Sequence, residues 1–179
     1  MSTAKIIFSG FGGQGVLMMG YVVATAGMLE DKHVTYLPSY GAEVRGGTAN
    51  CTVTVSDKPI ASPVASFPDL AVVMNTPSLM KFEGGVKPKG TVFLNSDLVD
   101  IKPKRRDIQV VAVPANSISE RIGNPRGANM VMIGALVQKT GLVSLKSVIS
   151  SVKNIFEAKG SKVHKMNTLA LKEGAAFVK

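Results

Sequence analysis

A turn of closely spaced glycines, Gly10-Phe-Gly-Gly-Gln-Gly15, constrains the fold of this chain more than any other feature. It follows the apolar run Ile6-Ile7-Phe8 and precedes a second apolar segment, residues 16–29. Turns of this kind between a buried strand and a helix are typical of α/β proteins, because glycine lets the backbone turn sharply and the helix lie close to the sheet. The chain is therefore expected to begin with a strand, a tight turn and a helix.

The segment around this turn, residues 6–29, carries no charged side chain and is long enough to cross a bilayer core of about 30 Å. Six of its residues are glycines, and Gln14 lies near its middle. Glycines this close together break a helix, and lipid cannot hydrate the broken backbone. We therefore expect no membrane span here and, because the apolar run is interrupted, no cleavable signal peptide.

Hydrophobic periodicity predicts strands that alternate with helices along the chain. The predicted strands are residues 4–9, 33–37, 49–56, 69–75, 91–95 and 108–113. The predicted helices are residues 16–29, 77–82, 129–137, 145–156 and 162–171. The alternation predicts an α/β fold, a Rossmann-like three-layer sandwich with a largely parallel central sheet. We find no repeat and no linker, so residues 1–179 are expected to form a single domain.

Two of these segments carry further information. Residues 49–56 alternate apolar and polar side chains, which indicates a strand with one buried face and one more polar face. Residues 129–137 are apolar nearly all round, so this helix should be buried on most sides. The strand at 33–37 is expected to stop at Pro38, because proline cannot donate to the ladder.

Cysteine usage limits the cofactors that the chain could hold. Cys51 is the only cysteine, which excludes an intrachain disulfide. An iron-sulfur cluster or a structural zinc ion needs several thiolates, so the chain alone is expected to hold neither. The absence of disulfides fits a reducing, cytoplasmic compartment.

The charge balance is strongly basic. Lysine and arginine number 21 against 12 aspartate and glutamate, which gives a formal net charge of +9 at pH 7. This excess favours acidic partners or phosphorylated ligands. The one tight basic cluster, Lys102-Pro-Lys-Arg-Arg106, has no aromatic side chain beside it on which bases could stack. We expect a solvated loop there and no nucleic-acid partner.

The glycine turn matches the dinucleotide-binding pattern G-x-G-x-x-G, and three interpretations of it stay open. The glycines could only permit tight packing, the turn and the helix start could bind phosphate or another anion, or the turn could bind a dinucleotide. The last interpretation expects an acid at the end of the second strand, whereas Glu30 and Asp31 precede that strand. The candidate binding residues of the turn are Gly10, Gly12, Gly13, Gln14 and Gly15.

A second candidate is the polar segment Tyr40-Gly-Ala-Glu-Val-Arg-Gly-Gly47, which we expect to be an ordered loop. Glu43 and Arg45 are two residues apart and would face the same side of an extended backbone. Gly46 and Gly47 would let a partner or ligand approach the main chain. The pair could form an interface contact, or Arg45 could grip a phosphate or carboxylate.

Residues for catalysis are scarce. His33 and His164 are the only candidates for near-neutral bases, and both are expected to be exposed or structural. Cys51 should face the core as an inert thiol. The chain contains no metalloprotease, P-loop or serine-hydrolase motif. We therefore assign no catalytic residue and no metal ligand, and we expect the isolated chain to have no catalytic activity of its own.

Several motifs in one order resemble the gamma subunit of 2-oxoacid:ferredoxin oxidoreductases of the 2-oxoglutarate, 2-ketoisovalerate or pyruvate type. They are Gly10–Gly15, Pro38–Cys51, Pro59 with Ser62-Pro63, Met74-Asn75 with Pro77-Ser78, and Gly123–Leu136. The resemblance extends from about residue 4 to residue 150. A series of separate motifs at matching spacing is far more specific than the glycine turn alone.

The resemblance implies a heteromeric enzyme that oxidatively decarboxylates a 2-oxoacid, transfers the acyl group to coenzyme A and reduces ferredoxin. It implies alpha and beta chains that hold thiamine diphosphate and magnesium, with iron-sulfur clusters in the beta chain or a small delta chain. The gamma domain would pack on these chains near the coenzyme A site, as a Rossmann-like unit without a redox centre of its own. The alternative from another class is a free-standing nicotinamide-dependent oxidoreductase.

Carried over to this sequence, the resemblance implies that the turn at Gly12–Gly15 and the loop at Tyr40–Gly47 lie at the interface with the catalytic chains. Arg45 would then pair with a phosphate or a partner carboxylate. Asn129 would orient the backbone at the start of the buried helix. Contact of these residues with coenzyme A is a hypothesis.

Overall fold

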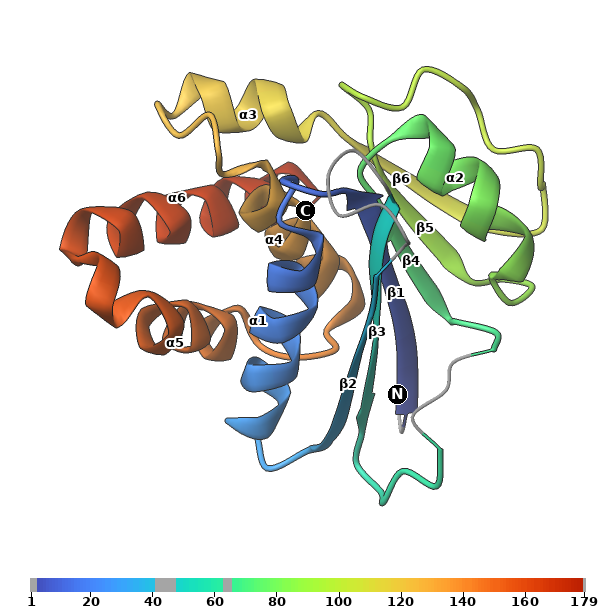
Figure 1. Cartoon of the computed structure of the whole chain (residues 1–179), viewed down its shortest axis with the longest axis horizontal. Coiled ribbons are helices and arrows are strands. Elements are labelled where there is room, and N and C mark those ends of the chain that lie inside the picture. The colour runs from blue at the N-terminus through green and yellow to red at the C-terminus, as the bar shows by residue number, and fades with distance from the viewer. Residues whose placement is uncertain (1–2, 41–47, 63–65, 179) are drawn as a thin grey trace.

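The computed structural model describes residues 3–40, 48–62 and 66–178, which form a six-stranded sheet with helices on both faces (Figure 1). The order of the strands across the sheet is β2-β3-β1-β4-β5-β6. The strands are β1 Thr3–Phe11, β2 His33–Tyr40, β3 Thr48–Ser56, β4 Leu70–Val73, β5 Thr91–Asn95 and β6 Gln109–Val113. All six predicted strands are confirmed.

Strand directions confirm a largely parallel sheet with one exception. β1, β4, β5 and β6 are neighbours in the sheet and run parallel to one another. β3 is antiparallel to both of its neighbours, β1 and β2. The exception is the strand whose sequence alternates apolar and polar residues, a pattern common in antiparallel strands. Cys51, Val53 and Val55 of β3 face the main core, as the alternation predicts.

The helices form two layers of unequal size. They are α1 Val16–Met28, α2 Thr76–Phe82, α3 Ala115–Arg121, α4 Ala128–Thr140, α5 Leu145–Phe156 and α6 Ser161–Phe177, with short 3₁₀ turns η1 Glu83–Gly85 and η2 Glu157–Lys159. Figure 1 shows α1, α4, α5 and α6 on one face of the sheet and α2 on the other. Ile6 and Phe8 of β1 belong to the larger core, and Ile7 belongs to the smaller one. β1 is therefore buried on both faces, and the three-layer prediction is confirmed.

Helix α4 lies at the centre of the larger layer. Its residues Met130 to Val137 are all buried, which confirms the prediction from their apolar sequence. Its main neighbour is α6, and the two backbones approach closely where Gly134 and Gly174 face the other helix.

One local prediction was wrong, and one helix was missed. β2 does not stop at Pro38 but continues to Tyr40, because β2 is the edge strand and a proline there breaks no ladder to a second neighbour. Helix α3 was not predicted at all. It has only seven residues, and its first turn is held from a distant loop, where the Asp97 carboxylate accepts hydrogen bonds from the N–H and the hydroxyl of Ser117 at 2.7 and 2.8 Å.

The basic loop at 102–106 is only partly the solvated loop that the sequence predicts. Lys102, Lys104 and Arg106 are exposed, as expected. Arg105 is half-buried: it forms an ion pair with Asp107, and its guanidinium donates to the carbonyl oxygens of Glu83 and Val86. This arginine therefore ties the loop to the chain after α2.

Across the described ranges, none of the helices combines the length and apolar character needed to span a bilayer.

Candidate functional site

The glycine turn connects the carboxyl end of β1 to α1 and lies at the surface. Gly13 and Gly15 have φ angles of 95° and 72°, in the left-handed region that favours glycine. Gly12 and Gly13 are exposed, and nothing lies within 4 Å of the position that a side chain on Gly13 would occupy. The tip of the turn therefore presents bare backbone to the outside.

Gln14 braces this turn from within. Its Oε1 accepts hydrogen bonds from the N–H of Phe11 at 2.7 Å and from the side chain of Asn75 at 3.1 Å, and its Nε2 donates to the carbonyl oxygen of Met74 at 3.3 Å. Met74 and Asn75 follow β4, so the glutamine joins the carboxyl ends of β1 and β4. This is the position where the chain leaves the sheet in opposite directions, the usual place for a ligand in such folds. Here the amide of Gln14 occupies it.

Gly15 and Asn129, both predicted site residues, lie against each other. A Cβ atom on Gly15 would collide with the side-chain amide of Asn129. Gly15 precedes α1, and Asn129 lies in the first turn of α4, so the N-termini of the two helices meet at this point. Neither helix has a side-chain cap or an acidic residue in its first turn. Uncapped N–H groups and aligned dipoles at helix N-termini favour an anion.

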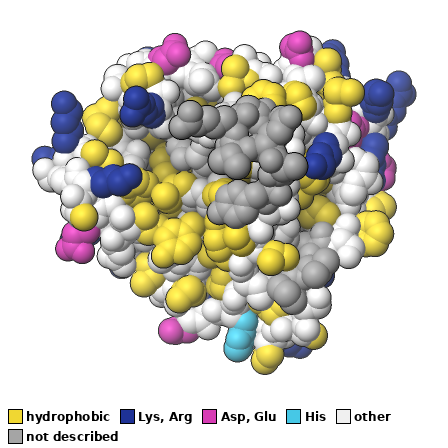
Figure 2. All heavy atoms as spheres, viewed as in Figure 1, with side chains coloured by type: hydrophobic (Ala, Val, Ile, Leu, Met, Phe, Trp, Pro, Cys, Tyr) yellow, Lys and Arg dark blue, Asp and Glu magenta, His cyan; other side chains and the backbone are white. Residues whose placement is uncertain are grey.

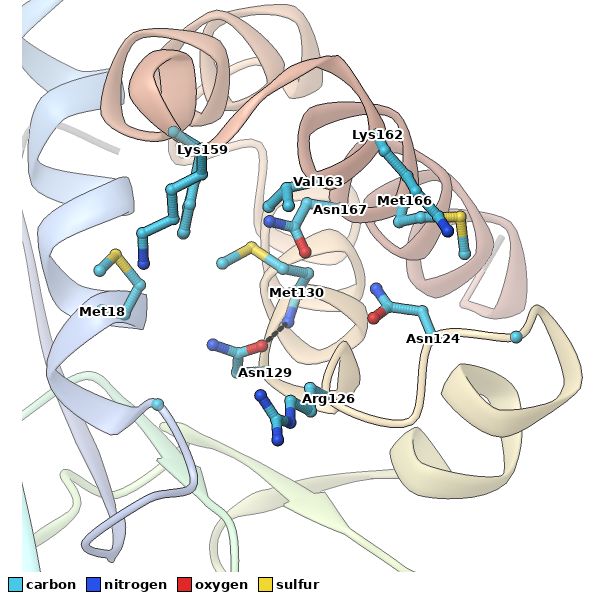
Figure 3. Close-up of a pocket in the computed structure, with 13 residues that line it drawn as sticks. Met18, Asn124, Arg126, Asn129, Met130, Lys159, Lys162, Val163, Met166 and Asn167 are labelled. Atoms are coloured by element: carbon cyan, nitrogen blue, oxygen red, sulfur yellow. Dashed lines mark hydrogen bonds between the residues drawn. The ribbon is translucent and has the colours of Figure 1, made fainter.

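A cleft of about 560 Å³ opens beside this meeting point, between α1, α4 and the start of α6 (Figure 3). We call it the α1–α4–α6 cleft. Its lining residues are Gly15, Met18, Gly123, Asn124, Arg126, Asn129, Met130, Phe156, Lys159, Lys162, Val163, Met166 and Asn167. This volume is within the range of small-molecule sites, roughly 300 to 1,000 Å³.

The lining of the cleft combines positive charge, carboxamides and an apolar wall, and it includes no acidic side chain. Arg126, Lys159 and Lys162 are exposed at the cleft, and no carboxylate in the described residues forms an ion pair with any of them. Figure 3 shows Lys159 reaching from the turn after α5 toward Met18 on α1. The cleft therefore has the composition of a site for an anion with an apolar part.

Asn124 adds an unsatisfied donor to the cleft. Its Nδ2 atom is buried and has no hydrogen-bond partner within the described part of the chain. The loop that carries Asn124 is held by Ser119, whose hydroxyl bonds the Asn124 carbonyl oxygen and accepts from the N–H of Gly127 at 3.0 Å. A buried donor without a partner lowers the stability of the fold, so a hydrogen bond from Asn124 Nδ2 to a ligand acceptor would recover that stability.

A smaller cavity of about 260 Å³ lies on the other side of Asn129. It is lined by Gly13, Gln14, Met74, Leu98, Asn116, Pro125, Arg126, Ala128 and Asn129. Arg126 and Asn129 line both cavities, so they form the ridge between the exposed turn and the larger cleft.

The structure brings together some of the predicted site residues and leaves others undescribed. Gly13, Gly15 and Asn129 meet at the two cavities, whereas Gly10 is packed against Val16 and Met74 under the turn. Tyr40 ends β2, paired with Ala49. Glu43, Arg45, Gly46 and Gly47 lie outside the described residues, so their roles stay predictions.

Sequence reasoning missed four residues of the cleft: Asn124, Arg126, Lys159 and Lys162. Asn124 and Arg126 lie within the Gly123–Leu136 motif, where only Asn129 was selected. Their position directly before a buried helix was the available signal. Lys159 and Lys162 lie in a separate, generally basic segment, and only the fold brings them to the glycine turn.

The sheet order removes the basis for the dinucleotide interpretation. In the dinucleotide-binding fold the acid that holds the ribose ends the strand beside the glycine turn. Here β3 lies between β1 and β2, which puts the end of β2 two strand spacings, about 10 Å, from β1. Glu30 has a different task, because its Oε1 accepts from the Ser144 N–H at 2.6 Å at the start of α5.

Cys51 faces the core, as predicted, and neither His33 nor His164 lines either of the two cavities described above. Burial raises the pKa of the Cys51 thiol to about 12, and its Sγ lies 3.6 Å from the carbonyl oxygen of Val16. His33 is exposed, and His164 lies 3.4 Å from Thr168 on the same helix. No group of three or more His, Cys, Asp or Glu suited to a metal ion occurs in the ranges that the structure describes.

Comparison with known proteins gives a match over nearly the whole chain. Residues 5–177 match the family described as pyruvate ferredoxin/flavodoxin oxidoreductase. The 2-oxoglutarate synthase subunit KorC of Methanocaldococcus jannaschii is 35% identical over 98% of this chain and 94% of its own length. The ketoisovalerate oxidoreductase subunit VorA of Methanothermobacter marburgensis is 34% identical, and the chain spans only 36% of that subunit's length.

Solved structures give the same fold. The gamma subunit of a keto/oxoacid ferredoxin oxidoreductase from Geobacter sulfurreducens superimposes with a TM-score of 0.85 and 27% identity, covering 98% of this chain and 96% of that one. A 2-oxoglutarate:ferredoxin oxidoreductase from Magnetococcus marinus has a TM-score of 0.90 at 22% identity, where this chain corresponds to 31% of the longer polypeptide.

Proposed function

The chain belongs to the pyruvate ferredoxin/flavodoxin oxidoreductase family, and on this premise we propose that it is the gamma subunit of a 2-oxoacid:ferredoxin oxidoreductase. The complex would decarboxylate a 2-oxoacid, join the acyl group to coenzyme A and pass two electrons to ferredoxin. The observation that carries the proposal is the match in both sequence and length to KorC, a subunit of 2-oxoglutarate synthase.

In this proposal the redox chemistry belongs to the partner chains. Thiamine diphosphate, magnesium and iron-sulfur clusters would be held by the alpha and beta chains and, where present, a delta chain. The residues of this chain do not fit an iron-sulfur cluster, because the one thiol, Cys51, is buried in the core between β3 and α1. The chain would act by binding and positioning.

The part of this chain that fits coenzyme A is the region where α1 and α4 begin. The exposed backbone at Gly12 and Gly13 leaves room for a group from outside, and Arg126 supplies positive charge between the two cavities. Asn129 would be fixed by the contact of its side chain with Gly15 and by its Oδ1, which accepts from the Met130 N–H at 2.9 Å. The predicted loop Tyr40–Gly47 would add to the interface with the catalytic chains.

Reconstitution tests this function. The purified chain is mixed with the alpha and beta chains encoded beside it, and the complex is assayed for coenzyme A-dependent reduction of ferredoxin by 2-oxoacids. We expect the chains to co-elute and the activity to depend on this chain. Full activity without it, or the absence of any association, would overturn the assignment.

A further inference from the structure

We propose that the second half of α1 and the neighbouring edge strand β2 form the contact surface for a catalytic chain of the complex. We call this surface the α1–β2 face. Its residues are Tyr21, Thr25 and Met28 of α1, Leu29 directly after it, and Tyr36 of β2. The identity of the partner rests on the proposed function. The motifs that carry the family resemblance leave out residues 16–37, so they give this surface no role.

Helix α1 is uncharged on its outer side as well as on its inner side. No residue from 6 to 29 is charged, yet the fold packs only one side of α1, against β2, β3 and α5. Tyr21, Met28 and Leu29 stay 49%, 64% and 48% exposed, and hydrophobic side chains gather on this side of the molecule (Figure 2). The surface helices α5 and α6 carry exposed lysines instead. A helix without a charged side is normally buried all round, so we expect a partner to cover the outer side of α1.

Two hydroxyl groups of the α1–β2 face already form hydrogen bonds within the chain. The Thr25 hydroxyl donates to the carbonyl oxygen of Tyr21 at 2.9 Å, and the Tyr36 hydroxyl donates to the carbonyl oxygen of Leu17 at 3.2 Å. The rings of Tyr21 and Tyr36 lie against each other, with their centroids 6.0 Å apart, and so join α1 to β2. A partner could therefore cover these groups without leaving their hydroxyls unpaired. Tyrosine and methionine are also enriched in the cores of protein interfaces.

β2 adds an open strand edge to the same surface. In the sheet that the described residues form, β2 pairs with β3 alone, so the main-chain groups on its other edge lie outside the ladder. Proteins usually protect such an edge with charged side chains, proline or a covering element, because it can pair with another chain. β2 contains no lysine, arginine, aspartate or glutamate, and Pro38 lies near its end. Most of this edge therefore fits a partner that covers it.

Two observations favour a catalytic chain over a second copy of this chain as the partner. Each copy carries a formal net charge of +9, so two copies would repel each other. The chain also spans only 36% of the length of VorA, so in that relative the matching region belongs to a longer polypeptide. Interfaces between permanently associated units are more hydrophobic than transient ones, as the α1–β2 face is. The partner would be the catalytic chain that corresponds to the remainder of VorA.

Binding of the full chain to the purified complex of the alpha and beta chains, measured by biolayer interferometry, tests the proposal. Met28→Lys should weaken binding at least about tenfold, because it places an unpaired charge in an apolar contact. Met80→Lys is the matched control, because Met80 lies on α2, on the other face of the sheet, and is 65% exposed against 64% for Met28. It should change the Kd less than about twofold.

Both variants should fold, because each new lysine lies near the C-terminus of a helix, where a cation is favourable. Circular dichroism and urea unfolding of the isolated variants check this. Tyr21→Ala is a second test that adds no charge. It should also weaken binding about tenfold, because tyrosine in the core of an interface contributes strongly to binding.

The outcomes separate this proposal from the proposed function. If the unchanged chain binds and both Met28→Lys and Tyr21→Ala bind equally well, the function stands and the α1–β2 face is not the contact surface. If the unchanged chain does not bind at all, the proposed function fails and the proposal fails with it. Size-exclusion chromatography with light scattering tests the other occupant. A stable dimer of the isolated chain that Met28→Lys dissociates would assign the face to a second copy and overturn the proposal.

Discussion

Two glycine-containing regions of this molecule have opposite surroundings. In the contact between α4 and α6, a Cβ atom on Gly134 would collide with the carbonyl oxygen of Leu171, and one on Gly174 would collide with the carbonyl oxygen of Val131. In the turn after β1, a Cβ atom on Gly13 would meet nothing within 4 Å. The first pair lets two backbones touch, whereas the turn leaves its space empty.

The difference separates a glycine that is required by a packed neighbour from one that is required by its backbone angle, since Gly13 has a φ of 95°. At the α4–α6 contact, glycine is required because the backbone of the other helix occupies the space that a side chain would need. At Gly13 the protein supplies no neighbour, so the missing side chain leaves room for a partner or a ligand. Figure 2 shows hydrophobic side chains gathered on the face where α1 lies in Figure 1. The exposed hydrophobic residues of α1 and β2 include Tyr21 and Leu37, at 49% and 44% exposure.

The largest expected effect is at the buried contact. Gly134→Ala should lower the free energy of unfolding by about 3 kcal/mol or more, because the backbone of α6 must move away and the core around α4 must repack. For a domain of this size such a loss lowers the Tm by roughly 6 to 12 °C. Urea and thermal unfolding followed by circular dichroism would measure both values.

Gly84→Ala is the matched control for that change. Nothing lies within 4 Å of the position of its added methyl group, and Gly84 does not adopt a positive φ. Its effect should be within about 0.5 kcal/mol of zero. If Gly134→Ala proved no more destabilising than Gly84→Ala, the contrast between the two regions would fail.

The next effect is at the turn. Gly13→Ala meets no steric obstacle, but a φ of 95° is unfavourable for alanine, so we expect a loss of about 1 to 2 kcal/mol and an intact fold. The same unfolding experiments apply. A loss as large as that of Gly134→Ala would show that the turn, too, is packed from within.

The sequence predicted the elements well and their arrangement less completely. The apolar runs, the alternation in residues 49–56 and the all-apolar helix at 129–137 each carry their own periodicity, so strands and core could be recognised locally. That β3 inserts between β1 and β2 could not, because strand order depends on pairings between distant segments. Short α3 was missed because its start is held by Asp97, outside the helix.

The site was predictable only where it is local in sequence. Gly13, Gly15 and Asn129 were named from motifs, and the fold brings them together. Lys159 and Lys162 belong to no motif, and their place beside the glycine turn follows from the packing of α6 on α4. The role of Gln14 as an internal brace also depended on β4, some 60 residues away in the chain.

A smaller, pH-dependent effect is expected at the junction of α1 and α5. Burial opposes ionisation of Glu30, but hydrogen bonds from Ser144 and Ser147 and the charge of Lys32 hold the pKa of its carboxyl below the ordinary value of 4.5. A lowered pKa in the folded state gives stability that is present above pH 4.5 and is lost as the pH falls through the folded pKa.

Glu30→Gln should therefore cost about 1 kcal/mol near pH 7 and progressively less as the pH falls below 4.5. Unfolding of the two proteins by urea from pH 3 to 7 measures the difference. A constant difference across that range would contradict the role of the charge.

The smallest expected effect is an absence of reaction at Cys51. With a pKa of about 12, about one thiol in ten thousand is ionised at pH 8, and the thiolate is the reactive form. Iodoacetamide should leave the native chain unlabelled over hours and should label it within minutes in urea, as mass spectrometry would show. Rapid labelling of the native chain would mean that the β3–α1 contact opens readily.

Hydrogen exchange in the assembled complex tests most directly whether the open glycine turn serves a partner or its ligand. The account predicts that the amides of residues 12–18 and 126–130 exchange at least about tenfold more slowly in the complex with coenzyme A than in the isolated chain, while those of α4 and α6 around Gly134 and Gly174 change little. Unchanged exchange at 12–18 and 126–130 in a complex known to have formed would contradict it.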